Sequence, residues 1–205
     1  MQPLLTILNQ TTDFLKRKGI EEARLDAQHL IAHGLGLRRL DLYLQFDRPL
    51  DEEEIARLRQ LVVRRGNREP LQHIIGTTAF FNLEIGCDPR ALIPRPETEQ
   101  LVERALKWSA TLSAGRVLEV GTGTGAPILA FAEARPEWRC AAVDLSPEAI
   151  SLARENAQRN GLENRVEWLV GDLAQPAAHL APFDLVIANL PYIPTQVIDQ
   201  LQPEV

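Results

Sequence analysis

The chain has 205 residues, of which 45% are hydrophobic and 24% are charged, an ordinary composition for a globular protein. No run is apolar enough to cross a bilayer, and the N-terminus lacks a basic stretch followed by an apolar one. We therefore expect neither a membrane span nor a signal peptide. The two cysteines, Cys87 and Cys140, match no metal-binding spacing, and His29, His33 and His73 are scattered. This pattern favours reduced thiols in a cytoplasmic protein and predicts no metal site.

The net charge of −6 is unevenly distributed along the chain. Residues 1–70 hold 12 Lys and Arg against 11 Asp and Glu, whereas residues 71–205 hold 10 against 17. Because extended nucleic-acid binding needs many phosphate contacts, the acidic second part argues against it. The one basic stretch favours a solvated helix face over a partner-binding face, and it consists of Arg57, Arg59, Arg64, Arg65 and Arg68.

The first seventy residues are predicted to be helical. Apolar residues from Leu4 to Leu15 recur at helical spacing, and Gly19 is a typical residue just beyond a helix end. A second helix is predicted from Glu22 to Leu35. Asp51 followed by Glu54 resembles a capping box and predicts the start of a third helix.

The character of the sequence changes after this helical part. Phe80 to Ile85 alternates partly and predicts a strand within a β-hairpin linker that covers residues 74–94. Pro94 to Glu99 then opens a helix, since proline in a first helical turn costs no hydrogen bond. We therefore place a helical N-terminal domain at residues 1–73 and a second domain at residues 95–205.

Short apolar runs alternate with helical segments throughout the second domain, which predicts a parallel sheet in a doubly wound α/β fold. A helix capped by Ser146 is expected after the second strand, and a helix over Ala126–Ala134 after the first. The predicted strands are Arg116–Val120, Cys140–Val143, Val166–Val170 and Leu185–Ala188.

A glycine-rich turn follows the first predicted strand, where a parallel sheet binds ligands. Glycine permits a tight turn and a close backbone approach, and the amides of the next helix point at the same place. The turn therefore predicts a nucleoside cofactor site rather than a plain tight turn. Its candidate residues are Glu119, Gly121, Thr122, Gly123, Thr124 and Gly125.

Two further acids follow the next strands. Asp144 ends the second strand, where a carboxylate can accept both ribose hydroxyls of an adenosine, and the spacing to the glycines also fits an NAD fingerprint. Glu119 favours a sulfonium donor, because its negative charge would repel a pyrophosphate. Asp172, next to Leu173, can accept a hydrogen bond from an adenine amino group, although a helix N-cap is an equal alternative.

The sequence Asn189-Leu190-Pro191-Tyr192 follows the fourth predicted strand. The side-chain oxygen of Asn189 can accept a hydrogen bond from a substrate N–H, and Pro191 restricts the backbone of Leu190 and so directs its carbonyl. Tyr192 can cover the flat face of an amide. These four residues are the candidate catalytic residues, and Asn189 also belongs to the predicted cofactor site. Together with the glycine turn, the motif resembles amino-methyltransferases that use S-adenosylmethionine.

Over essentially its whole length the chain resembles the protein-(glutamine-N5) methyltransferases of the PrmC/HemK type. Two further segments carry the resemblance, Arg68 to Gly76 and Leu92 to Glu99. The resemblance implies a helical N-terminal domain that helps recognise the substrate, and a Rossmann-like catalytic domain that uses S-adenosyl-L-methionine. It also implies N5-methylation of the glutamine in the Gly-Gly-Gln motif of class-1 peptide chain release factors, by a cytoplasmic monomer.

Two departures from the family pattern are present. Leu190 replaces the first proline of Asn-Pro-Pro-Tyr, and family members continue beyond Val205, so we expect the chain to lack C-terminal strands. Two alternatives remain open. One is methylation of another protein glutamine or of an amine in nucleic acid, and the other is a cofactor-binding module with impaired catalysis.

Overall fold

The computed structural model describes residues 1–190, which fall into two compact units. The first unit covers Met1–Ile75 and the second begins at Gly76. The described Asn189 and Leu190 belong to the second unit, whereas Pro191 and Tyr192 lie outside the described residues. None of the described helices is both long and apolar enough to cross a membrane.

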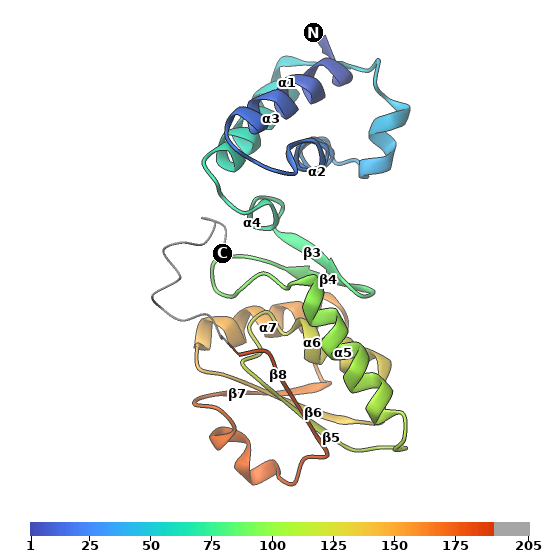
Figure 1. Ribbon diagram of the computed structural model, residues 1–205, viewed down its shortest axis with the longest axis vertical. Helices are drawn as coiled ribbons and strands as arrows, with labels where there is room; N and C mark the ends of the chain where they lie inside the picture. The colour runs from blue at the N-terminus through green and yellow to red at the C-terminus, as the bar shows by residue number, and fades with distance from the viewer. Residues whose placement is uncertain (191–205) are drawn as a thin grey trace. The chain divides into compact units, whose positions relative to one another are not determined.

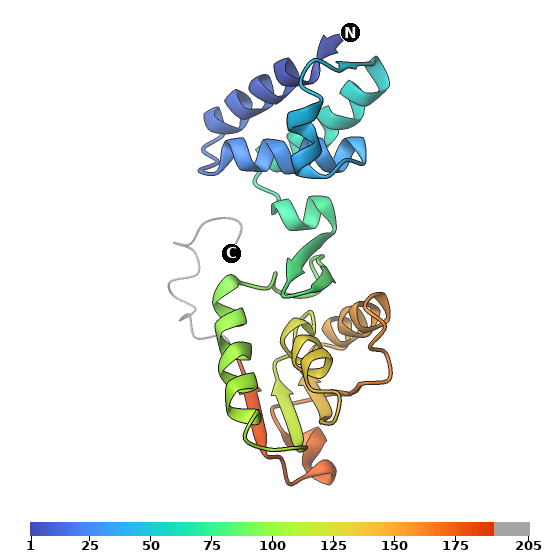
Figure 2. The same cartoon turned by 90° about the vertical axis from the view of Figure 1, so that its right-hand side faces the viewer.

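The first unit is a helical bundle with a short two-stranded pairing at one end (Figures 1 and 2). The core consists of apolar residues from all of its long helices, among them Leu8, Leu30, Ile31 and Leu58. The elements are β1 (Gln2–Pro3), α1 (Leu4–Arg17), α2 (Ala23–Leu35), the 3-10 helix η1 (Arg39–Leu44), β2 (Pro49–Leu50), α3 (Glu52–Gly66) and α4 (Leu71–Ile75).

Local signals account for the ends of these helices. The backbone N–H of Glu54 donates to Asp51 Oδ1 at 2.8 Å, and the backbone N–H of Asp51 donates to Glu54 Oε2 at 3.1 Å, which confirms the predicted capping box. Gly19 follows α1 with a φ of +75°, a left-handed conformation that glycine adopts without strain. The interpretation of the basic stretch as fully solvated is wrong at Arg65, which is buried against Asp26.

The second unit begins with an antiparallel hairpin and continues as an α/β sheet. Its elements are β3 (Thr77–Phe80), β4 (Leu83–Gly86), α5 (Pro96–Ser109), β5 (Arg116–Val120), α6 (Ala126–Ala134), β6 (Arg139–Asp144), α7 (Pro147–Arg159), β7 (Val166–Val170), the 3-10 helix η2 (Gln175–Leu180) and β8 (Leu185–Ala188). The hairpin differs from the prediction, because Phe80 to Ile85 is not one strand. Phe81 takes a φ of +50° and turns the chain there.

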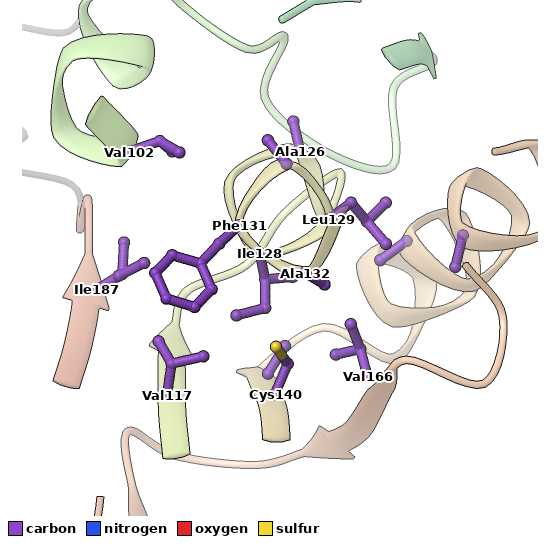
Figure 3. Packing of buried hydrophobic residues seen from close by; sticks show 14 of the residues in the cluster. Val102, Val117, Ala126, Ile128, Leu129, Phe131, Ala132, Cys140, Val166 and Ile187 are labelled. Carbon is purple, nitrogen blue, oxygen red and sulfur yellow. The ribbon is translucent and has the colours of Figure 1, made fainter. Parts of the chain in front are cut away.

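The four-stranded sheet is parallel, with the strand order β7-β6-β5-β8. Alternate residues of each strand point to opposite faces, so Val117 and Cys140 belong to one core cluster and Leu118 and Ala141 to another. Figure 3 shows Phe131 of α6 and Val117 of β5 within the first cluster. The strand order reverses direction at β5, so the turns after β5 and β8 lie next to each other.

Candidate functional site

A cavity of about 450 Å³ opens at the carboxyl ends of the parallel strands. This volume lies within the range of roughly 300–1,000 Å³ that is typical of small-ligand sites. Its position is the crevice beside the reversal of strand order, where open α/β sheets bind ligands. The lining comes from residues 90–95, 119–124, 143–146, 171–173 and 189–190, together with Thr98, Pro127 and Ala149.

The glycine turn forms the floor of this cavity. The backbone N–H groups of Gly121 and Thr122 both donate to the Val143 carbonyl, at 2.9 and 3.1 Å, and so tie the turn to β6. Gly121 and Gly123 have φ angles of +73° and +54°, which L side chains rarely adopt. Thr122 and Thr124 are buried and line the same cavity. The turn thus exposes backbone, rather than side chains, to a ligand.

Gly125 has a different function from the other two glycines of the turn. It is absent from the cavity lining and precedes α6 with a φ of +80°. A Cβ on Gly125 would lie 3.0 Å from Ala153 Cβ and 3.1 Å from an edge atom of Trp168. Glycine is therefore required here for the close packing of the helix start against α7 and β7, and not for space inside the cavity.

Asp144 is positioned at the end of β6, with its carboxylate against the glycine turn. Its Oδ2 accepts the backbone N–H of Gly123 at 2.8 Å, and its Oδ1 accepts that of Ser146 at 3.0 Å. A carboxylate offers about four lone-pair sites, so two such bonds leave capacity for further hydroxyl donors. Asp144 thus holds both loops in place while it lines the cavity.

Glu119 is buried near the end of strand β5, with only 3% of its surface exposed. Burial raises its pKa to about 8, although hydrogen bonds from the Thr122 hydroxyl and from the backbone N–H of Ile128 oppose this shift. Burial therefore favours the protonated form of Glu119 in the ligand-free protein, whereas the sequence alone suggests an ordinary ionised carboxylate. A cationic ligand in the cavity would favour the ionised form of this carboxyl group.

The turn after β7 completes the cofactor side of the cavity. Asp172 is exposed at the cavity wall, and η2 begins without a side-chain cap, so the N-cap alternative for Asp172 is wrong. Leu173 has a φ of +49° and is 56% exposed, and Leu145 on the neighbouring loop is 72% exposed. Both leucines line the cavity and offer apolar surface to a flat ring.

Asn189 and Leu190 form the wall on the side of β8, which pairs with β5 (Figure 1). The side-chain Nδ2 of Asn189 donates to the hydroxyl Oγ1 of Thr98 at 3.2 Å. A Cβ on Gly121 would lie 2.8 Å from Cδ2 of Leu190, so the end of that side chain lies close to the glycine turn. The structure thus brings the predicted acceptor Asn189 to the same cavity as the glycine turn.

Sequence reasoning missed the residues that precede α5 as part of the site. Residues 90–95 and Thr98 line the cavity, although this segment was singled out only as a family resemblance. Arg90 binds Asp88 and Glu155 through its guanidinium, with the shortest N–O distances at 2.7 and 2.6 Å. These ion pairs hold the loop onto α7. The sequence signal that could have identified this part of the site was the distinctive segment from Leu92 to Glu99. No local pattern in that segment indicates that it contacts a ligand.

A buried amide joins the hairpin to the glycine turn. Asn156 of α7 accepts the backbone N–H of Gly86 at 2.7 Å, and it donates to the carbonyls of Gly86 and Thr124 at 3.2 and 2.9 Å. Only 1% of its surface is exposed, so all three bonds are shielded from water. Strand β4 is thereby held in a fixed position against the turn.

The part of the chain that the structure describes contains no group of three or more His, Cys, Asp or Glu residues that could bind a metal ion. The two cysteines are free and buried. Desolvation raises the pKa of the Cys87 thiol to about 11 and that of Cys140 to about 12. Both therefore remain protonated thiols, which are poor nucleophiles.

The residues present fit a nucleoside cofactor that carries a positive charge. Asp144 can accept ribose hydroxyls with its remaining lone pairs, and the buried Glu119 lies where a cation would be stabilised. Leu145 and Leu173 provide apolar surface for the base, and Asp172 provides an acceptor at the same wall.

Comparison with known proteins matches two families to the chain, one to its N-terminal part and one to its C-terminal part. Residues 6–76 match the family described as PrmC N-terminal domain, and residues 117–205 match the family described as Methyltransferase domain. Among solved structures, the ribosomal protein L11 methylase from Lactobacillus delbrueckii subsp. bulgaricus has a TM-score of 0.40 and 28% identity, and the likeness covers 47% of each chain.

Curated relatives match over almost the whole chain. The release factor glutamine methyltransferase of Geobacter sulfurreducens is 44% identical over 97% of this chain and 68% of its own length. The protein of the same name from Deinococcus radiodurans is 41% identical over 98% of this chain and 71% of its own length. The chain therefore belongs to the release factor glutamine methyltransferase family, and its cofactor is S-adenosyl-L-methionine.

Proposed function

We propose that the protein transfers a methyl group from S-adenosylmethionine to the side-chain nitrogen of the glutamine in the Gly-Gly-Gln motif of class-1 release factors. The observation that carries this proposal is the position of Asn189, whose side chain lines one cavity together with the glycine turn and Asp144. The names of the relatives support the choice of substrate.

When bound, S-adenosylmethionine supplies an electrophilic methyl group. The chain supplies position and orientation. Glu119, Asp144 and Asp172, with the turn from Gly121 to Thr124, would hold the cofactor, and Gly125 would act indirectly by placing the start of α6. Leu173 would pack against the base. These assignments follow from the lining of the cavity and from the chemistry of each group.

On the acceptor side, Asn189 Oδ1 and the Leu190 carbonyl would each accept one N–H of the glutamine side chain. An amide nitrogen is a weak nucleophile because its lone pair is delocalised, so two acceptors that favour a pyramidal nitrogen would lower the barrier. The side chain of Leu190, which replaces the first proline of Asn-Pro-Pro-Tyr, would restrain its backbone by contact with Gly121. The proposed roles of Pro191 and Tyr192, rigidity and cover for the amide plane, lie outside the described residues. The proton leaves the methylated nitrogen to water.

The remaining parts of the proposal concern the substrate. The helical region, residues 1–73, would contact the release factor outside its Gly-Gly-Gln loop, and the hairpin of residues 74–94 would link it to the catalytic region, residues 95–205. A lower KM for the intact factor than for a Gly-Gly-Gln peptide would be expected, and equal KM values would contradict this role. We place the protein in the cytoplasm as a monomer, with the acidic second half disfavouring extended nucleic-acid binding.

The test is turnover with a purified class-1 release factor. Mass spectrometry of the Gly-Gly-Gln peptide should show the gain of one methyl group, and a factor with Gly-Gly-Ala should show none. Asn189→Ala should reduce kcat by roughly 100-fold or more, as when a group that stabilises only the transition state is removed, while the calorimetric affinity for S-adenosylmethionine stays nearly constant. Binding of NAD in place of S-adenosylmethionine, or methylation of nucleic acid alone, would contradict the proposal.

A further inference from the structure

We propose that Thr98 is a positioning residue that holds the amide of Asn189 in the orientation needed for methyl transfer, an inference that rests on the proposed function. Asn189 Nδ2 donates to Thr98 Oγ1 at 3.2 Å, across a separation of 91 residues in the sequence. Both side chains line the cavity that contains the glycine turn. The contact therefore joins the start of α5 to the end of β8 inside the site.

The two partners differ in burial. Asn189 is exposed and follows the last residue of β8, whereas Thr98 is only 7% exposed and lies in the first turn of α5. The backbone N–H of Thr98 donates to the Arg95 carbonyl at 2.9 Å, which anchors the backbone of Thr98 at the helix start. A buried hydroxyl on a helix thus accepts a hydrogen bond from an exposed amide at a strand end.

In the observed orientation the oxygen end of the Asn189 amide is the available one. Because the two polar atoms of a planar amide lie on opposite sides, Oδ1 does not face Thr98 when Nδ2 donates to it. No residue in the described part of the chain donates a hydrogen bond to this oxygen, so it can accept one from a substrate N–H. An amide turned by half a rotation would present its own N–H groups to the N–H groups of the glutamine, and neither side could then accept.

A second bond keeps the start of α5 in place. Glu99 Oε1 accepts the backbone N–H of Phe81 at 3.0 Å, so the residue after Thr98 is bound to the turn of the β3–β4 hairpin. The segment from Pro94 to Glu99 is therefore held on one side and holds Asn189 on the other. This arrangement gives a physical reason for a distinctive sequence that lies far from the Asn-x-Pro-Tyr turn along the chain.

The test compares Thr98→Val with Thr98→Ser. Valine keeps the shape of the side chain but accepts no hydrogen bond, so kcat should fall by about 3- to 10-fold, as expected for one lost hydrogen bond. The affinity for S-adenosylmethionine and the urea midpoint should stay within error. Serine restores the hydroxyl and should recover most of the activity. Thr111→Val is a matched control, because its hydroxyl donates to the Trp108 carbonyl at 2.9 Å at the far end of the same helix.

A double-mutant cycle separates positioning from a structural role. In the Asn189→Ala background, Thr98→Val should cause no further loss of kcat, because the group that it orients is gone. Equal and additive losses in both backgrounds, or unchanged turnover of Thr98→Val, would overturn the inference while the wild-type activity leaves the proposed function intact. A wild-type chain that fails to methylate any release factor would instead overturn the proposed function, and with it the role of Thr98.

Discussion

The two units of the protein each bury an acid, but only one of these acids is paired with a cationic side chain among the described residues. In the helical unit, Asp26 lies against Arg65 with a distance of 2.7 Å between Oδ2 and Nε, and both side chains are 10% exposed. In the sheet unit, Glu119 is 3% exposed, and no Lys or Arg of the described residues pairs with it. Its hydrogen-bond partners are a hydroxyl and a backbone N–H group instead.

This difference distinguishes an acid that is paired within the fold from an acid whose cationic partner would be a bound ligand. A buried carboxylate costs several kcal/mol unless a cation or hydrogen bonds offset its desolvation. Asp26 has its cation inside the protein, whereas Glu119 lines a cavity that fits a cationic cofactor. The comparison predicts that changes at the first site affect stability alone, and that changes around the second affect both pH dependence and binding.

The largest expected effect is on the free energy of unfolding of Glu119→Gln, because the variant lacks the buried carboxyl group that destabilises the wild type as the pH rises. The pKa of Glu119 rises from an ordinary 4.5 to about 8, which at 1.36 kcal/mol per pKa unit corresponds to about 5 kcal/mol. Since the folded state binds this proton more tightly, the contribution is present below pH 4.5 and is lost as the pH rises to about 8. The variant should therefore gain stability relative to wild type between pH 5 and 9.

Urea unfolding at several pH values measures this difference. The exposed Glu103 offers a control, because Glu103→Gln should leave the pH dependence of the wild type unchanged. A constant difference between Glu119→Gln and wild type across the pH range would show that folding does not raise the pKa of Glu119. The proposed contrast between Glu119 and the paired acid Asp26 would then be wrong.

A loss of about 3–5 kcal/mol is expected for Arg65→Met, because Asp26 would be left buried without its cation. The effect should be confined to the helical unit, so circular dichroism in urea should show earlier unfolding while calorimetry shows unchanged affinity for S-adenosylmethionine. Arg59→Met, an exposed position on the same helix, is the control. A parallel loss of cofactor affinity in Arg65→Met would contradict the separation of the two acids by function.

A smaller effect, about 1–3 kcal/mol in cofactor binding, is expected for Asp144→Ala, which removes the acceptor for ligand hydroxyls and for the Gly123 N–H. Asp184→Ala is a matched control at the opposite end of the sheet. Its Oδ2 accepts the Arg116 backbone N–H at 2.8 Å, but it does not line the cavity. Calorimetry should show weaker binding only for Asp144→Ala, and equal affinities for both variants would place the cofactor elsewhere.

Much of the sheet could be predicted from the sequence because its signals are local. Arg116–Val120, Val166–Val170 and Leu185–Ala188 have the predicted bounds, since each is a short apolar run followed by a turn. The hairpin turn was misplaced because Phe81 adopts a positive φ without a glycine to indicate it. The short helix Leu71–Ile75 and η1 were also missed, since neither is long enough to show a period.

The site was predictable where it depends on topology and not where it depends on packing. Because parallel strands end at one edge, Asp144 and Asn189 could be assigned to one cavity without coordinates. The hydrogen bond from Asn189 to Thr98 joins distant residues that share no local pattern. The raised pKa of Glu119 results from burial, which is a property of the assembled fold.

The placement of β8 has a consequence for the order in which the site is made. Strands β5, β6 and β7, which carry the cofactor turn and Asp144, precede β8 in the chain. During synthesis from the N-terminus, these strands leave the ribosome first, and β8 joins the edge of the sheet afterwards. Its pairing with β5 closes a long loop, which is a slow step in forming parallel sheets. A nascent chain thus gains the means to hold its methyl donor before it gains the asparagine that selects the acceptor.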